Sequence, residues 1–354
     1  MFKFAPRILS ILLVGSLTPT AGHGALDVSG YFDVELIHKK SSSRPVVRQH
    51  HLNLLLQHSV ENYKFFAEIE FEDATDLNYG QTAITDDSKK AKQGRLFVER
   101  AYGEVTWSPM AHLTVGQMLH TSYYLLNHYP SLTVNFTDPA TRKAIFDYNV
   151  KGATFWGEYG DFYYDVWTGR GPATPDVTST PAVPTDTTGS FEYGMDWGAK
   201  LAYTVGSDKK KTTFAVLTAE YSNGLIGGVP AGVDRSVGGE VVAHWDNFTL
   251  LSEFGERVDD VTSGKSVKAN YVIGSYTFTL ENGAELSPYL MVDSLKINSD
   301  HQARSRNALG LNYKPNAAVT TKFEYLTTNS YQKIQGTDIL SDNQAALVFV
   351  YFYN

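Results

Sequence analysis

The sequence predicts an all-β protein, a transmembrane antiparallel up-and-down β-barrel of about sixteen strands. Three observations carry this prediction. Several long segments alternate strictly between apolar and polar side chains, no segment keeps the period of a helix, and short and long connections alternate along the chain.

The first 24 residues have the layout of a secretory signal peptide. Lys3 and Arg7 form a basic start, an apolar run follows over residues 8–17, and the segment ends in small residues at Gly22 and Gly24. The run is too short to span a bilayer as a helix, and no later segment approaches the required apolar length. We expect cleavage after Gly24, which leaves residues 25–354 as an outer-membrane β-barrel domain.

Charge and composition exclude several classes of function. The chain has 38 Asp and Glu against 30 Lys and Arg, so nucleic acid is not an expected partner. It has no cysteine, which excludes disulfides, thiolate metal sites and haem attached through cysteine. Its 22 Tyr and 19 Phe suit the aromatic girdles of a membrane barrel.

Alternation with a period of two residues identifies the strands in chain order. The clearest alternating segments are 26–36, 63–73, 191–205, 235–245 and 318–327. The lengths of these segments fit the roughly nine to eleven residues that a tilted strand needs to cross a membrane. Segment 96–107 is less regular, because Glu99 or Arg100 falls on its mostly apolar face in either reading.

Segment 191–205 shows the two faces most clearly. Every second side chain is apolar or aromatic, and the residues between them include no large apolar side chain. We predict that one face meets lipid and the other lines a lumen. The lipid-facing set includes Tyr193, Trp197 and Leu201, and the lumen-facing set includes Glu192, Asp196 and Lys200.

The connections fall into two classes. The short ones carry turn residues and occur near 61–62, 108–109, 158–160, 206–210, 246–247, 281–283 and 314–316. The long ones are roughly 39–47, 73–94, 119–145, 169–189, 223–234, 258–264, 298–302 and 329–342. In outer-membrane barrels the short turns are periplasmic and the long loops are external. Segment 169–189 is rich in Pro and Thr; it is an interdomain linker or, as we prefer, one of these loops.

Three environments for the apolar faces compete: the core of a soluble sandwich or solenoid, lipid around an open barrel, or lipid around a barrel that holds an enzyme site or a partner. A membrane barrel explains the long strands and their aromatic ends. It also explains the charged second faces, which suit a water-filled lumen better than a dry core. Sixteen strands are enough to leave an aqueous channel.

The mature chain resembles a sixteen-stranded Gram-negative porin. Its last ten residues, 345–354, form an apolar and aromatic strand that resembles the terminal assembly signal of outer-membrane barrels. The stretch Glu99–Met118 is similar to a strand–turn–strand unit of the phosphate-selective porin group. The resemblance implies a homotrimer embedded in the lipid of the bacterial outer membrane. For the subgroup it implies an anion pathway lined by Arg and Lys.

The third long connection is the candidate constriction. In porins the third external loop commonly folds into the pore, and the position of segment 119–145 in the chain matches. Asp138, Arg142 and Lys143 would then supply charge at the narrowest point. The alternative is a solvated external loop.

Charged side chains on the polar faces are the candidate pore wall. They are the carboxylates Asp33, Glu35, Glu68, Glu70 and Glu72 and the basic residues Arg304, Arg306 and Lys322. Carboxylate rows attract cations, whereas two guanidinium groups on one strand face can bind an anion. The alternative is a solvated wall on which no single residue is essential. From the overall acidic balance we expect weak cation preference.

The sequence offers no metal, cofactor or catalytic site. His50 and His51 are expected on opposite faces of a strand, and no nucleophile–base arrangement is evident. We therefore predict a channel for passive diffusion of ions and small hydrophilic solutes, and not an enzyme. The alternative is a structural sleeve that holds a partner protein across the membrane.

Overall fold

The computed structural model describes most of the chain. The described residues are 26–40, 45–77, 95–119, 133–137, 139, 141, 145–146, 149–170, 195–207, 210–226, 229–259, 265–297, 302–330 and 343–353. None of them forms a helix long and apolar enough to cross a membrane. The predicted signal peptide, residues 1–24, lies outside the described part, so its boundary stays a prediction.

Antiparallel strands account for almost all of the described residues. In chain order they are β1 (Asp27–Lys39), β2 (Val46–Val60), β3 (Tyr63–Leu77), β4 (Arg95–Ser108), β5 (Ala111–Leu119), β6 (Asn149–Tyr159), β7 (Phe162–Arg170), β8 (Met195–Ser207), β9 (Lys210–Ile226), β10 (Val229–Trp245), β11 (Phe248–Asp259), β12 (Lys265–Tyr276), β13 (Phe278–Thr279), β14 (Glu285–Ile297), β15 (Gln302–Asn316), β16 (Val319–Ser330) and β17 (Gln344–Tyr353).

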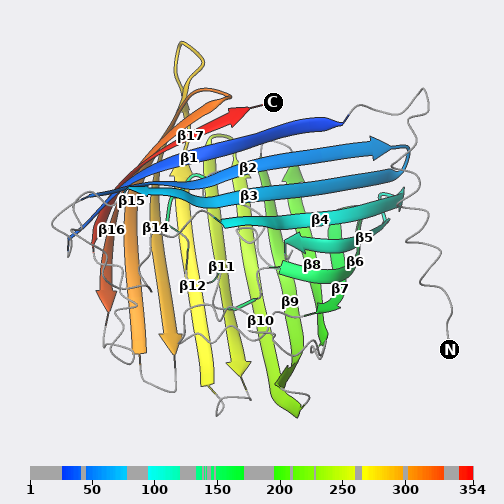
Figure 1. The fold of residues 1–354 in the computed structure, drawn as a ribbon. Coiled ribbons are helices and arrows are strands. Elements are labelled where there is room, and N and C mark those ends of the chain that lie inside the picture. Colours follow the sequence, from blue (N-terminus) through cyan, green and yellow to red (C-terminus); the bar gives the residue numbers. More distant parts are fainter. Residues whose placement is uncertain are drawn as a thin grey trace, which may run out of the picture.

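The strands close into a single barrel (Figure 1). Neighbours in the chain are neighbours in the sheet, and β1 pairs with β17 as well as with β2. The two-residue β13 continues β12 beyond Thr277 and pairs with the same neighbour, β14, so the described residues form sixteen full strands. The predicted up-and-down barrel is confirmed. Closure satisfies the backbone hydrogen bonds within the wall, as lipid requires.

The barrel wall has an apolar outer face and a charged inner face. On β8, the side chains of Trp197 and Leu201 are exposed by 51% and 40%, whereas Asp196 and Lys200 are buried. Side chains alternate because the strand period is two residues. The predicted orientation of this segment is confirmed for these four residues, and its first part, 191–194, lies outside the described residues.

Two β-bulges explain where strict alternation fails. In the pairing of β1 with β2, His50 and His51 together oppose the single residue Asp33. Both imidazoles therefore reach the inner-facing carboxylates of β1, and the expectation that they point to opposite faces is wrong. A bulge inserts one extra residue, so two successive side chains can share a face.

The irregular segment on β4 has the same cause. Glu99 is the extra residue between the pairs Glu68↔Arg100 and Ile69↔Val98. Glu99 is buried and Arg100 bonds to Glu68 on the inner wall, so both charges avoid the apolar outer face. The neighbouring Val98 is exposed on the outside.

Short turns close one end of the barrel. Two-residue turns join β2 to β3 and β10 to β11, and their first residues, Glu61 and Asp246, have φ of 53° and 52°. Positive φ is the backbone conformation that a tight hairpin demands. The predicted short connections near these positions are confirmed. Most of the predicted long connections lie largely outside the described residues. The long connection predicted over 223–234 is wrong, because β9 continues to Ile226 and β10 begins at Val229.

Candidate functional site

Carboxylates dominate the charged side chains of the inner wall. Among the described residues, twelve Asp and Glu are buried, against four Lys and Arg. The buried acidic residues are Asp33, Glu35, Glu68, Glu70, Glu99, Asp165, Asp196, Glu220, Glu240, Glu253, Asp293 and Glu324. The buried basic residues are Lys200, Arg257, Arg306 and Lys322.

The structure places the predicted wall residues on this inner face, except that Arg304 is only half-buried and the side chain of Glu72 is not described. Asp33, Glu35, Glu68, Glu70, Arg306 and Lys322 are buried, and Arg304 is half-buried. Glu72 belongs to β3 and pairs with His51 through the backbone, but its side chain lies outside the described part. The sequence-predicted wall set therefore comes from four strands, β1, β3, β15 and β16.

Ion pairs hold many of these charges in fixed positions. Arg48 Nε lies 2.5 Å from Glu35, and Arg100 Nε lies 2.6 Å from Glu68. Lys200 pairs with Glu240 in the same way. Such charge-assisted bonds are stronger than bonds between neutral groups, and they hold both side chains in a defined geometry.

Arg306 is part of this system of pairs. Its Nε donates to Asp293 on the neighbouring strand β14 at 2.6 Å, and its Nη2 also bonds to that carboxylate. The sequence suggested that Arg304 and Arg306 bind an anion together. In the structure the Asp293 carboxylate already pairs with Arg306, so Arg306 is less available to a passing anion. Arg304 lies two residues closer to the start of β15 and is paired with Leu295 of β14.

The described residues between 133 and 146, here called the inner segment, lie within the barrel against the inner wall. Lys322 of β16 donates to the carbonyl oxygens of Thr133 and Asn135, the second at 3.1 Å. Asn312 of β15 donates to the carbonyl of Thr133 at 3.4 Å. Because Lys322 and Asn312 face inward, these bonds place the segment inside the barrel.

Glu324 is the main acceptor for the inner segment. Its carboxylate accepts the backbone N–H groups of Phe136 at 3.1 Å and Thr137 at 3.2 Å, and the hydroxyl of Thr137. The hydroxyl of Tyr289 donates to the same carboxylate at 2.5 Å. Four donors thus converge on one buried side chain.

A glycine on the wall makes room for this arrangement. A Cβ built at Gly310 would lie 2.0 Å from Cζ of Tyr289, so no larger residue fits beneath that ring. Covering of a strand glycine by an aromatic ring is a known device of β-sheets. Here it sets the position of the tyrosine that donates to Glu324.

The far part of the inner segment contacts different strands. Thr141 donates to Glu253 of β11 at 3.0 Å, and Ser236 of β10 donates to the carbonyl of Ile145 at 2.6 Å. Ile145 and Phe146 pack on an apolar patch of the inner wall formed by Val267, Ala269 and Ile297. The described residues of the segment therefore contact the wall from β10 to β17, and Phe136 also packs beside Tyr31 of β1.

The predicted constriction residues Asp138, Arg142 and Lys143 lie outside the described residues. Their described neighbours, Thr137 and Thr141, are both bonded to inward-facing carboxylates. The inward course of this connection agrees with the interpretation drawn from its position in the chain. The role of the three charged residues stays a prediction.

Sequence reasoning missed the residues that hold the segment. Glu324 lies on the polar face of the predicted strand 318–327, so alternation was able to place it in the lumen. Nothing in the sequence links it to Phe136, which is 188 positions away. Tyr289 was missed because aromatic side chains were assigned to the outer face.

Comparison with known proteins identifies the fold. The sequence matches no protein-family model and no curated protein. Among solved structures, the outer membrane channel DcaP of Acinetobacter baumannii is similar with a TM-score of 0.61 at 15% identity, covering 95% of this chain and 99% of that one. The trimer form of OmpT, an outer membrane protein of Vibrio cholerae, gives 0.60 at 14%, covering 93% and 99%. An anion-selective porin from Comamonas acidovorans gives 0.56 at 10%, covering 93% and 99%. The chain thus has the barrel fold of these proteins over nearly its whole length.

Proposed function

We propose that the chain is a bacterial outer-membrane porin, a water-filled channel for passive diffusion of ions and small hydrophilic solutes. The apolar outer face meets lipid, and the charged inner face meets water. Transport is diffusion past the narrowing made by the inner segment, biased by fixed charge on the wall. No catalytic step is assigned to the chain.

One observation carries this proposal. A closed barrel with an apolar outside holds a segment of its own chain inside, bonded through Lys322 and Glu324 to the inner wall. A barrel built only to stay in the membrane has no need of a bonded segment in its lumen. A size-selective channel requires a narrowed aperture of constant width. A segment held in the lumen by hydrogen bonds provides one.

Uptake by proteoliposomes tests the proposal. Vesicles that contain the purified barrel should swell in isotonic solutions of small sugars, at rates that fall steadily as the sugar grows. Swelling comes from diffusion, so the rate should rise in proportion to solute concentration without saturation. A structural sleeve that needs its partner protein would give no swelling above that of protein-free vesicles, and that result would reject the channel.

Weak cation selectivity is the expected electrical property. The buried carboxylates of the described wall outnumber its buried basic side chains, so the lumen should concentrate cations. At 0.1 M salt the screening length is about 10 Å, so the preference should persist there and fade toward 1 M. The porin described as anion-selective is only 10% identical to this chain. We therefore expect the ion selectivity of this chain to follow from its own wall charges.

The double variant Glu68→Gln, Glu70→Gln should reduce the preference for potassium over chloride. Reversal potentials in a potassium chloride gradient measure it. Glu285→Gln is the matched control, because Glu285 is exposed at the start of β14 beside a short turn and should leave the reversal potential unchanged. An anion-selective reversal potential, with conductance that saturates as phosphate rises, would contradict the expectation and point to Arg142, Lys143 and Arg304.

A homotrimer is the proposed assembly. The Vibrio cholerae neighbour was solved in a trimer form, and the outer face of this barrel offers extensive apolar surface. Mass measurement of the native detergent complex, corrected for bound detergent, tests the proposal. A mass of one chain would reject it.

A further inference from the structure

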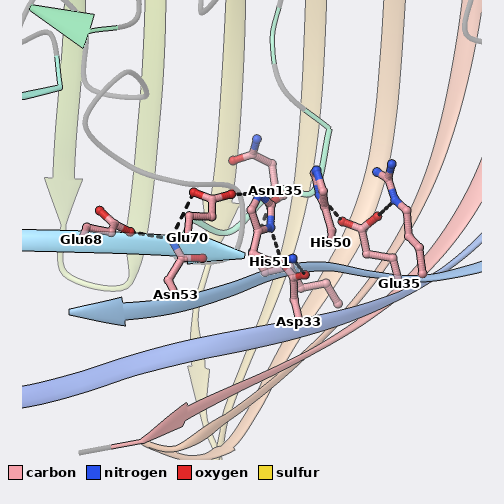
Figure 2. Close-up of polar contacts among 10 residues, drawn as sticks. Asp33, Glu35, His50, His51, Asn53, Glu68, Glu70 and Asn135 are labelled. Carbon is pink, nitrogen blue, oxygen red and sulfur yellow. Dashed lines mark hydrogen bonds and ion pairs between the residues drawn. The ribbon is translucent and has the colours of Figure 1, made fainter. Parts of the chain in front are cut away.

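The bulge in β2 gathers two imidazoles and a carboxylate on the inner wall. His51 Nδ1 lies 2.7 Å from Asp33 Oδ2, and the ring centroids of His50 and His51 are 3.7 Å apart. One candidate ligand atom from each of Asp33, His50 and His51 lies within 4.8 Å of the other two. Figure 2 shows the three side chains beside one another on the paired strands β1 and β2.

Further carboxylates surround the two imidazoles. Glu35 Oε1 lies 3.0 Å from His50 Nδ1, and Glu70 Oε1 lies 3.6 Å from His51 Nε2. Arg48 bonds to the other oxygen of Glu35 at 2.5 Å, which orients that carboxylate. Three acidic side chains from two strands therefore converge on one histidine pair.

We propose that Asp33, His50 and His51 form a binding site for a divalent transition cation such as Zn²⁺ or Cu²⁺. Imidazole nitrogen and carboxylate oxygen are ligands that these cations prefer, at about 2.0–2.2 Å for zinc. Side-chain movements of about 1 Å bring atoms that lie within 4.8 Å of one another to that distance. Glu35 and Glu70 either orient the imidazoles, as carboxylates commonly do around metal-binding histidines, or complete the coordination.

The site is accessible from one side. The side chain of His50 is 24% exposed, whereas those of His51, Asp33 and Glu35 are almost entirely covered. A cation in the lumen can therefore reach the pair past His50 while the remaining ligands are held by the wall. Binding narrows the same lumen and neutralises part of its negative charge, so the bound cation should lower the potassium current.

Copper spectroscopy tests the site without relying on the channel. We expect one equivalent of Cu²⁺ added to the purified barrel to give an electron paramagnetic resonance spectrum with coupling to imidazole nitrogen. That coupling should be lost in the double variant His50→Gln, His51→Gln, whose side chains keep polar groups at both positions. Asp33→Asn retains both imidazoles and should weaken Cu²⁺ binding by roughly tenfold or more. This second variant tests the site even if the double histidine variant does not fold.

His112→Gln is the matched control. This histidine also neighbours a carboxylate, with Nδ1 4.0 Å from Glu104, but it lies on β5 outside the cluster. Nitrogen coupling that persists in the double variant, or that disappears in His112→Gln, would overturn the proposal. A site made only of hydrogen-bonded histidine–carboxylate pairs would give no nitrogen coupling in the wild-type protein, which would overturn it as well.

Current recordings add a functional readout. We expect micromolar Zn²⁺ to reduce potassium conductance reversibly, EDTA to restore it, and Mg²⁺ at the same concentration to have little effect, since Mg²⁺ prefers oxygen ligands and keeps its waters. In the double histidine variant the half-blocking Zn²⁺ concentration should rise roughly tenfold or more. An unchanged value would contradict the proposal. Because spectroscopy reports binding in detergent, a barrel that binds copper but conducts nothing would reject the proposed function alone.

Discussion

Replacing Glu324 by Ala is expected to raise single-channel conductance and to make the open current noisy. The substitution removes the acceptor for two backbone N–H groups and a hydroxyl of the inner segment, and for the hydroxyl of Tyr289. Hydrogen bonds to a charged group contribute about 1.5–3 kcal/mol each, and a buried donor left without an acceptor costs about 1–3 kcal/mol. The segment should therefore leave its bound position, which widens the path.

Two variants separate loop anchoring from charge. Glu324→Gln retains one acceptor oxygen, so its conductance should fall between those of the wild type and Glu324→Ala. Glu104→Ala removes a carboxylate that bonds to Thr114 of β5, away from the inner segment, and should leave the current steady. Equal conductance and noise in the wild type and Glu324→Ala would show that the inner segment does not control the path.

Introducing Arg at Leu201 should destabilise the barrel by about 2–4 kcal/mol. Leu201 lies in the middle of β8 on the apolar outer face, where a guanidinium would have to enter hydrocarbon. Denaturant unfolding from lipid vesicles measures the loss, because it compares the inserted barrel with the unfolded chain in water.

Met195→Arg is the depth control for this experiment. Met195 lies on the same face of the same strand but at its first residue, where the expected cost is about 0–1 kcal/mol. Equal losses at the two positions, or no loss at Leu201, would contradict a lipid-facing surface and favour a soluble assembly.

The barrel and its outer face were predictable from sequence for a physical reason. Lipid demands closure and an apolar exterior along every strand, so alternation such as that around Trp197 repeats through the chain. The turn at Glu61 and Asn62 was predictable because polar residues interrupt two alternating segments. These features are local, and each can be recognised in a window of a few residues.

The residues that face the inner wall were less predictable, because long-range contacts determine which side chains point inward. On β12, Tyr271 and Ile273 are buried inside while Lys268 and Asn270 are exposed outside, the reverse of what alternation alone suggests. This strand turns apolar residues inward where its inner wall packs against Phe146 and β14.

The bulge at His50 was also beyond sequence reasoning. The sequence around His50 does not show that two residues of β2 oppose Asp33. A bulge depends on the register with the neighbouring strand, which the local sequence does not contain. A shift of one residue moves every later side chain to the other face. Candidate sites that depend on two adjacent residues sharing a face therefore become visible only in the structure.

Conductance of the purified wild-type protein in a planar lipid bilayer tests the channel most directly. The account predicts discrete, long-lived current steps in potassium chloride without any added protein, whose size grows with salt concentration and does not saturate. It predicts also a reversal potential of cation-selective sign at low salt. A correctly folded, inserted barrel that gives no steps across a range of salts and solutes would contradict the channel and leave the structural sleeve as the better interpretation.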